Sequence, residues 1–437
     1  MNQSKILSNF NITQFNEMQT ATSLAVEKSN EVVLISPTGS GKTLAFLMPV
    51  VALLKSDKKE VQVLILVPTR ELAQQIEQVF KQMGLGFKIN SCYGGHSVQI
   101  ERNNLAQPPA VLVGTPGRVA HHIRKKTLNV ASTDILILDE FDKSLEAGFH
   151  EEMSFIIKNI RHLQKKILTS ATALKDVPSF VGVKDPLELD FTGEEKQFKS
   201  ALKVKSVRVP GEDKLEALLL LIGKIGTQST IVFCNHRDAV DRISEQLTKL
   251  KIEHGFYHGG LEQINREKTL IKLRNGSITL LISTDLAARG LDIPEIEAVI
   301  HYQMPTTEDT MIHRNGRTAR MNAGGTAYFL LERDDYLPPF LMITPEEEFL
   351  PKKMERPQAG EWKTLYISAG KKDKVNKMDI VGMLLQKGNL KKEDVGKIEV
   401  LDHSAYVAIK SNKIIAALQQ VKDERVKNKK VKMEISS

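Results

Sequence analysis

The chain has 437 residues, of which 41% are hydrophobic and 26% charged, and its formal net charge is +8. This length indicates about three domains, and the composition excludes wholesale disorder, a collagen-like repeat and a coiled-coil rod. The longest apolar run, residues 44–54, falls short of the roughly 18 residues that a membrane-spanning helix needs, and no secretory leader is visible, so no membrane or lipid attachment is expected.

Residues 1–202 alternate short apolar runs rich in β-branched residues with helical patterns. The predicted strands are 32–35, 61–67, 110–113, 135–138 and 166–168, and the predicted helices include 43–54 and 70–83. Residues 203–334 repeat this rhythm, with strands predicted at 230–233, 279–282 and 298–300 and a helix at 239–250. Alternating strands and helices predict two α/β domains, each with a parallel sheet between layers of helices.

The remaining chain is predicted to hold a linker and a small α+β domain. Residues 335–360 contain five of the 16 prolines and an acidic triplet, which is typical of a linker. Residues 361–437 predict a β-α-β-β-α-β order. They carry 17 Lys and Arg against 10 Asp and Glu, which gives +7 of the total +8. Such a module suits a polyanion, most often nucleic acid, although a solvated lysine-rich surface would have the same composition.

Residues 36–43 read Ser-Pro-Thr-Gly-Ser-Gly-Lys-Thr, between a predicted strand and a predicted helix. This is the context of a phosphate-binding loop, in which glycines let backbone N–H groups approach phosphates. Lys42 would reach the terminal phosphates, and Thr43 would hold Mg²⁺. The segment therefore predicts a nucleoside triphosphate site.

Two further segments complete a candidate hydrolytic site. A buried strand ends in Asp139 and Glu140, at the sheet edge where ligands bind. Asp139 would bind the Mg²⁺ shell and Glu140 would orient or deprotonate the attacking water. Residues 313–320 contain three arginines, which are poor core material but suit phosphate. Arg317 and Arg320 are the candidate arginine fingers, so the nucleotide would lie between the two α/β domains.

Taken in order, these motifs resemble those of the DEAD-box RNA helicases over residues 10–330. Besides the three segments above, the resemblance rests on Gln19 and on residues 68–73, 94–95, 115–118, 170–172, 231–235, 263–266, 283–285 and 288–292. The sequence departs from the family pattern at Phe141 in the second motif, at Phe15 and Asn16 before Gln19, and at Ala319. Because Asp139 and Glu140 are intact, activity is still expected.

The resemblance implies two tandem RecA-like domains and an RNA-stimulated ATPase with Mg²⁺ as its metal. The implied catalytic residues are Lys42, Asp139, Glu140, Arg317 and Arg320. The implied ATP contacts are Gln19, Thr38, Gly39, Ser40, Gly41, Lys42, Thr43, Gly290 and Asp292. Ser170, Thr172 and His313 are implied to couple hydrolysis to RNA binding. The implied contacts to the RNA backbone are Thr69, Arg70, Gly95, Thr115, Arg118, Gln263, Arg266 and Thr284.

Residues 361–437 resemble the RNA-binding domain of the DbpA-type subgroup. Tyr366 occupies a position where an aromatic ring can stack on a base, and Lys371, Lys372 and Lys374 are candidate phosphate contacts. Packing of Tyr366 against Tyr406 in a domain with no RNA contact is the alternative. The subgroup implies binding to 23S ribosomal RNA, and hence separation of short RNA duplexes during large-subunit assembly by a monomer.

Other functions stay open on the sequence alone. They are a general RNA-remodelling helicase or an ATP-gated RNA clamp in RNA decay, cold response or translation, and a DNA helicase of the same superfamily. The two cysteines, Cys92 and Cys234, exclude a disulfide framework, predict core positions and indicate a reducing, cytoplasmic compartment. His121 and His122 are expected on a solvated helix face.

Overall fold

The computed structural model describes residues 3–10, 12–37, 39–95, 98–172, 176–192, 202–211, 213–288, 293–294, 296–318, 324–341, 343–357, 360–427 and 429–436. The chain divides into two compact units, one formed mainly by residues 1–199 and the other mainly by residues 200–437. Within these described ranges, no helix has the combination of length and apolar character that crossing a membrane requires.

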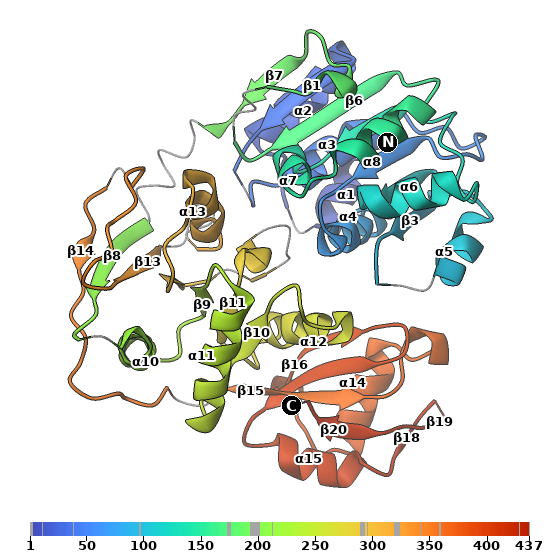
Figure 1. The fold of residues 1–437 in the computed structure, drawn as a ribbon. Coiled ribbons are helices and arrows are strands. Elements are labelled where there is room, and N and C mark those ends of the chain that lie inside the picture. Colours follow the sequence, from blue (N-terminus) through green and yellow to red (C-terminus); the bar gives the residue numbers. More distant parts are fainter. Residues whose placement is uncertain are drawn as a thin grey trace. The chain divides into compact units, whose positions relative to one another are not determined.

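Seven parallel strands form the sheet of the first unit, in the order β3-β4-β2-β5-β6-β1-β7 (Figure 1). They are β1 (Glu31–Ile35), β2 (Val63–Leu66), β3 (Ile89–Cys92), β4 (Val111–Gly114), β5 (Ile135–Leu138), β6 (Lys165–Ser170) and β7 (Leu187–Asp190). All five strands predicted in this part of the chain are confirmed. The two edge strands, β3 and β7, were not predicted, because each is short and half polar.

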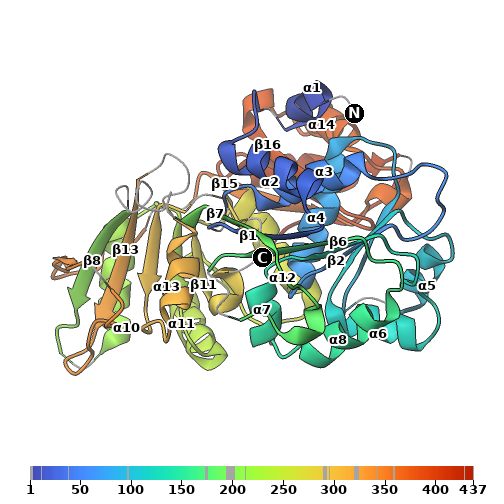
Figure 2. The same ribbon diagram turned by 90° about the horizontal axis from the view of Figure 1, so that it is seen from above.

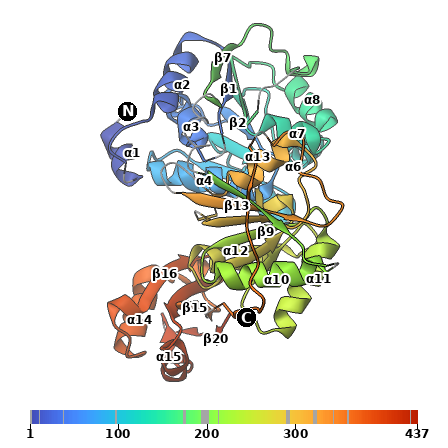
Figure 3. The same ribbon diagram turned by 90° about the vertical axis from the view of Figure 1, so that its left-hand side faces the viewer.

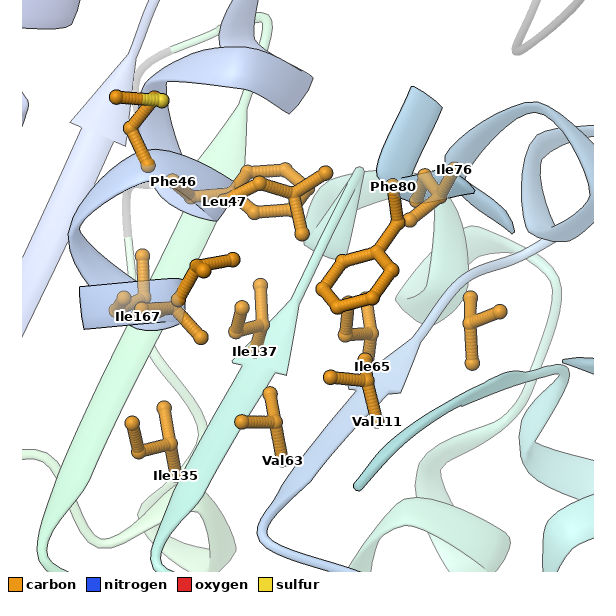
Figure 4. Close-up of a cluster of buried hydrophobic side chains, with 14 of the residues drawn as sticks. Phe46, Leu47, Val63, Ile65, Ile76, Phe80, Val111, Ile135, Ile137 and Ile167 are labelled. Carbon is orange, nitrogen blue, oxygen red and sulfur yellow. The ribbon is translucent and has the colours of Figure 1, made fainter. Parts of the chain in front are cut away.

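Helices cover both faces of this sheet, as predicted (Figure 2). They are α1 (Gln3–Asn9), α2 (Glu17–Lys28), α3 (Lys42–Ala52), α4 (Arg70–Met83), α5 (Val98–Leu105), α6 (Pro116–Arg124), α7 (Phe141–Glu146) and α8 (His150–Asn159). Successive strand residues point to opposite faces, so β2 sends Ile65 into one core and Leu64 into the other. Figure 4 shows Phe46 of α3 and Phe80 of α4 lying over strand residues in the first of these cores.

The second unit contains another parallel sheet of seven strands, in the order β10-β11-β9-β12-β13-β8-β14. Its strands are β8 (Leu202–Arg208), β9 (Thr230–Phe233), β10 (Gly255–Tyr257), β11 (Leu280–Ser283), β12 (Ala298–His301), β13 (Gly325–Leu331) and β14 (Glu346–Glu347). Its helices are α10 (Lys214–Ile225), α11 (Arg237–Lys249), α12 (Gln263–Arg274) and α13 (Glu308–Asn315). The apolar sides of α10 and α11 share one core with β9 and β12.

The segment 335–360 differs from the free linker that its prolines suggest. Its acidic triplet supplies β14, which pairs with β8, and Glu348 forms ion pairs with Lys205 and Lys224. Leu350 and Met354 pack against the core of the second sheet. Opposite charges and two apolar side chains therefore hold much of this segment on the second sheet.

Residues 362–435 form an α+β module with the predicted β-α-β-β-α-β order. The elements are β15 (Trp362–Ile367), α14 (Lys377–Gln386), β16 (Val395–Val400), β17 (Ala405–Lys410), α15 (Ile414–Val421) and β20 (Met433–Ile435). The antiparallel sheet has the order β16-β17-β15-β20, and α14 and α15 lie together on one side of it (Figure 3). A two-stranded hairpin, β18 (Arg425–Val426) and β19 (Lys429–Lys430), was not predicted.

Candidate nucleotide and RNA sites

The predicted residues of the first unit divide along the C-terminal edge of its sheet. Lys42 and Thr43 follow β1, Asp139 and Glu140 follow β5, and the predicted coupling residues Ser170 and Thr172 lie at the end of β6, between these two strands. Gln19 lies on α2, before β1. The predicted RNA contacts follow the next three, β2, β4 and β3. Because parallel strands deliver their loops to one edge of the sheet, the strand order alone separates a nucleotide half from an RNA half. Thr38, Gly290, Asp292 and Arg320 lie outside the described residues.

The phosphate-binding loop closes over its own lysine. The ammonium group of Lys42, at the first residue of α3, donates to the carbonyl oxygens of Ser36 and, at 3.0 Å, of Pro37. The hydroxyl of Ser40 donates to the same Pro37 oxygen at 2.9 Å. These bonds hold a positive charge at the N-terminus of a helix, where backbone N–H groups favour a phosphate.

Two amide side chains from the start of α2 fix the shape of this loop. Asn16 caps α2 and donates to the Ser40 carbonyl at 3.1 Å, and Gln19 donates to the Gly41 carbonyl at 3.4 Å. Gly41 has a φ of 91°, and a Cβ there would lie 2.7 Å from the Gln19 amide nitrogen. Only glycine suits both conditions. Asn16, a departure from the family pattern, thus takes part in the site, whereas adenine recognition by Gln19 stays a prediction.

Asp139 and Glu140 are held by a threonine that the sequence analysis missed. The Thr169 hydroxyl, on β6, donates to Asp139 Oδ1 and accepts from the Glu140 backbone N–H at 3.2 Å. Burial raises the pKa of Asp139, while the Thr169 hydrogen bond and the charge of Lys42 act in the opposite direction. Glu140 has a φ of 47°, in the left-handed region that costs strain for a residue other than glycine. Thr169 therefore orients both carboxylate residues.

Thr169→Val should lower the turnover number for ATP about 10- to 100-fold, as expected for loss of a residue that orients the carboxylate predicted to bind Mg²⁺. The substitution keeps the shape of the side chain but removes the hydroxyl. RNA-stimulated ATPase activity at saturating RNA is the measurement. Thr133→Val is a matched control, because Thr133 is equally buried but bonds to the Val61 carbonyl at the other end of β5. Equal losses in both variants would contradict the role of Thr169.

The third motif contacts the second motif within the first unit. The Ser170 hydroxyl donates to the Thr172 carbonyl at 2.7 Å, and the Thr172 hydroxyl donates to Asp142 Oδ2 at 3.5 Å. Phe141, where the family has alanine, is completely buried in the core beneath β6. The Phe141 side chain therefore packs in the hydrophobic core, and Asp139 and Glu140 keep their positions at the end of β5.

The predicted RNA residues of the first unit sit at the starts of helices and in a glycine turn. Thr69 caps α4, where its hydroxyl accepts from a backbone N–H at 3.2 Å, and Thr115 precedes α6. Gly95 has a φ of 94°, and a Cβ there would lie 2.5 Å from the Arg70 guanidinium. Arg118 pairs with Glu101, with 2.6 Å between Nε and Oε2. Helix starts and glycine turns expose N–H groups, which suits phosphate contacts without base reading.

The second unit divides its predicted residues in the same way. Gln263 and Arg266 lie on α12, which follows β10, and Thr284 follows the neighbouring β11. His313 lies on α13 and Arg317 just beyond it, between β12 and β13. Both His313 and Arg317 are buried. The strand order again places the predicted RNA contacts toward one side of the sheet and the residues predicted to reach the phosphates toward the other.

Arg314 corrects the expectation that arginines of this segment are poor core material. Its side chain is completely buried and over the Phe233 ring. The guanidinium donates twice to Asp285, at 2.5 and 3.1 Å, and also to Asn235 at 2.7 Å. A charged side chain can be buried when its hydrogen-bond donors have partners in this way. Arg314 thus ties three motifs of the second unit together.

Comparison with known proteins decides the family. Residues 16–180 match the DEAD/DEAH box helicase family, 213–322 the helicase conserved C-terminal domain and 364–435 the DbpA RNA binding domain. The chain is 29% identical to the ATP-dependent RNA helicase DbpA of Bacillus subtilis, over 98% of this chain and 96% of that relative. It is 34% identical to the ATP-dependent RNA helicase eIF4A of Neosartorya fischeri, over 71% of this chain and 79% of that relative. The chain belongs to the DEAD-box RNA helicases of the DbpA type.

A comparison with solved structures supports the RecA-like fold of the helicase. A solved structure of Saccharomyces cerevisiae Dbp5 bound to RNA and ADP BeF3 matches with a TM-score of 0.69 at 24% identity, over 79% of this chain and 93% of that chain. This likeness confirms two RecA-like domains. Its family membership makes the chain an RNA-stimulated, ATP-dependent helicase, as its motifs predict.

The C-terminal module of the helicase presents only part of its sheet to solvent. Tyr366 is half-buried, and its ring lies 5.4 Å from that of the buried Tyr406. On the same face, Glu399 accepts two hydrogen bonds from Arg274 at 2.9 and 2.7 Å, and Thr364 accepts one from Asn275 at 2.9 Å. Lys371, Lys372 and Lys374 are exposed at a separate turn. The lysines are thus more accessible than the tyrosine.

The expectation that His122 lies on a solvated helix face was wrong, and the core positions predicted for Cys92 and Cys234 are confirmed. His122 is completely buried rather than solvated, because both of its ring nitrogens have partners, Glu101 and Thr127, each at 2.8 Å. Cys92 and Cys234 are buried and free.

Proposed function

We propose that this helicase separates short RNA duplexes during assembly of the large ribosomal subunit and is directed there by 23S ribosomal RNA. The observation that carries the proposal is the match of residues 364–435 to the DbpA RNA binding domain, within a segment that holds +7 of the +8 net charge. On this proposal, 1–202 and 203–334 are the two helicase domains, and 361–437 is the RNA-binding domain. Each copy carries every motif and acts as a cytoplasmic monomer.

Mg²⁺ fits the residues that would hold it. Asp139 offers a buried carboxylate whose charge is costly without a cation, and Thr43 offers a hydroxyl beside the phosphate loop. Oxygen donors of this kind are the ligands that Mg²⁺ prefers. When bound, the ion would neutralise charge on the phosphates of ATP. Lys42 would bind the phosphates, Glu140 would hold the attacking water, and Arg317 with Arg320 would stabilise negative charge during transfer.

The RNA backbone would run over the residues that follow β2, β3 and β4 in the first unit and β10 and β11 in the second. Ser170, Thr172 and His313 would couple nucleotide state to RNA binding, and the contact between Thr172 and Asp142 supports this role. Because these contacts read sugar and phosphate, the core would accept many RNAs. Preference for one RNA would then come from the C-terminal module.

The test replaces Lys371, Lys372 and Lys374 with glutamine and titrates RNA affinity against salt. Each lost phosphate contact should flatten the slope of log affinity against log salt by about 0.7–0.9. The control is the same change at Lys387, Lys391 and Lys392, which are exposed elsewhere in the module. An unchanged slope in the first triple variant would assign those lysines to solvated surface.

Specificity is tested by removing residues 361–437. The truncated helicase should keep its ATPase activity at saturating RNA but lose any preference for a 23S ribosomal RNA fragment over an unrelated RNA of equal length. If the preference persists, specificity lies in the helicase core. If the full chain shows no preference at all, the general RNA-remodelling function replaces the ribosomal one.

A further inference from the structure

Glu101 is the centre of a buried polar network on the RNA half of the first sheet. It lies on α5 and is 5% exposed. One of its carboxylate oxygens accepts a hydrogen bond from the backbone N–H of Tyr93 at 3.1 Å. The other lies 2.6 Å from Arg118 Nε and 2.8 Å from His122 Nε2. One carboxylate thus accepts two hydrogen bonds and forms one ion pair, with partners from two separate segments.

Both segments carry proposed RNA contacts. Tyr93 ends the β3 segment and directly precedes the Gly94-Gly95 turn. Arg118 and His122 lie on α6, which begins after Thr115 at the end of the neighbouring strand β4. Glu101 therefore fixes the position of the glycine turn relative to the start of α6. It also holds the base of the Arg118 guanidinium, whose side chain is only 14% exposed.

The same side chains come close enough to be considered as metal ligands, since donor atoms of Cys92, Glu101 and His122 lie within 4.8 Å of one another. Their chemistry argues against it. Glu101 already neutralises Arg118, and the second nitrogen of His122 is engaged by Thr127 at 2.8 Å. Burial raises the pKa of the Cys92 thiol to about 12, so it stays protonated, whereas a metal binds the thiolate.

We propose that Glu101 is a positioning residue for RNA binding, which holds the Gly95 turn and Arg118 at the spacing that a bound phosphate backbone requires. The inference rests on the proposed RNA contacts of the first unit. It adds a residue that touches neither RNA nor ATP. Glu101→Gln keeps the size of the side chain but removes the negative charge that faces Arg118 and His122, so the turn and the helix lose their common anchor.

Glu101→Gln should raise the RNA concentration for half-maximal ATPase stimulation about 10- to 100-fold, the range in which small displacements of binding groups act. The KM for ATP without RNA and the turnover number at saturating RNA should stay within about twofold, because the nucleotide residues follow other strands. His122→Asn shortens the side chain, so it removes the Nε2 donor to Glu101 and leaves Arg118 paired, and it should show a smaller rise of the same kind. Thermal unfolding shows that each variant is folded.

Glu77→Gln is the matched control. Glu77, on α4, also anchors β3 through its carboxylate by accepting from the Ser91 hydroxyl, whereas Glu101 reaches Tyr93 and α6. An equal rise in this control would indicate general loosening of β3 and overturn the proposal. An unchanged RNA requirement in both Glu101→Gln and His122→Asn would overturn it as well. Arg118→Gln distinguishes a failure of the proposed RNA contact from a failure of the positioning role of Glu101. If it also leaves RNA binding unchanged, the proposed contact itself fails; if it weakens binding while Glu101→Gln does not, only the positioning role fails.

Discussion

Replacing Glu140 with glutamine is expected to lower ATP turnover about 10²- to 10⁴-fold, the usual contribution of a general base. ATP and RNA should still bind, because glutamine has the same shape and the backbone N–H of residue 140 keeps its hydrogen bond to Thr169. The strained φ of 47° at this residue would also be unchanged. Single-turnover hydrolysis and equilibrium binding of a fluorescent ATP analogue measure the two effects separately.

Glu146→Gln is the control for that experiment. Glu146 lies at the end of α7, the helix that begins directly after Glu140, but its side chain is 49% exposed and pairs with Lys143 at 2.8 Å. Its substitution should leave turnover unchanged. Wild-type hydrolysis by the Glu140 variant would show that another group activates the water.

Replacing Arg317 with alanine should lower turnover about 10³-fold, the lower end of arginine-finger effects. Arg317 follows α13 directly, so its position depends on that helix. Binding of RNA in the absence of ATP should be unchanged. RNA-stimulated ATPase activity, with thermal unfolding measured beside it, tests this expectation. Arg237→Ala is the control, because Arg237 is 70% exposed on α11 and pairs with its neighbour Asp238.

Arg314 should respond differently although it belongs to the same motif. Its guanidinium is enclosed by Asp285, Asn235 and the Gln303 carbonyl. Arg314→Ala would leave these acceptors without their donor, which costs about 3 kcal/mol of stability for a buried ion pair. A loss of turnover without loss of stability at Arg314, or the reverse at Arg317, would contradict this division of roles.

The sequence predicted the elements whose burial is strongest. The central strands β2, β4 and β5 are apolar throughout and were recognisable at once. The missed strands were of two kinds. Strands such as β3 and β7 lie at an edge and are half polar, whereas β8 and β13 mix buried and partly exposed residues without a regular alternation over seven positions. Segment 335–360 was predicted as a linker, and its proline content could not reveal that Glu348 pairs with Lys205 and Lys224 on the second sheet.

Motif residues could be named from the sequence because their order matches a family, but their supporting residues could not. Thr169 and Glu101 act through contacts between strands and helices that are distant in sequence. Arg314 does so too, and its place in a motif did not reveal its burial. A buried hydroxyl at the end of an apolar strand, as at Thr169, is the one local signal that was available. The spacing of Glu101 from Arg118 and His122 has no meaning until α5 and α6 are packed together.

The burial of Cys92 and Cys234 has a practical consequence for measuring motion. Burial raises the pKa of both thiols to about 12, so neither forms the reactive thiolate at neutral pH. A thiol-directed dye would therefore react selectively with cysteines introduced on the surface. Glu151 on α8 and Asp238 on α11 are exposed and lie in different units. A donor and an acceptor dye at these two positions would report, by energy transfer in single molecules, how the distance between the units responds to ATP and RNA.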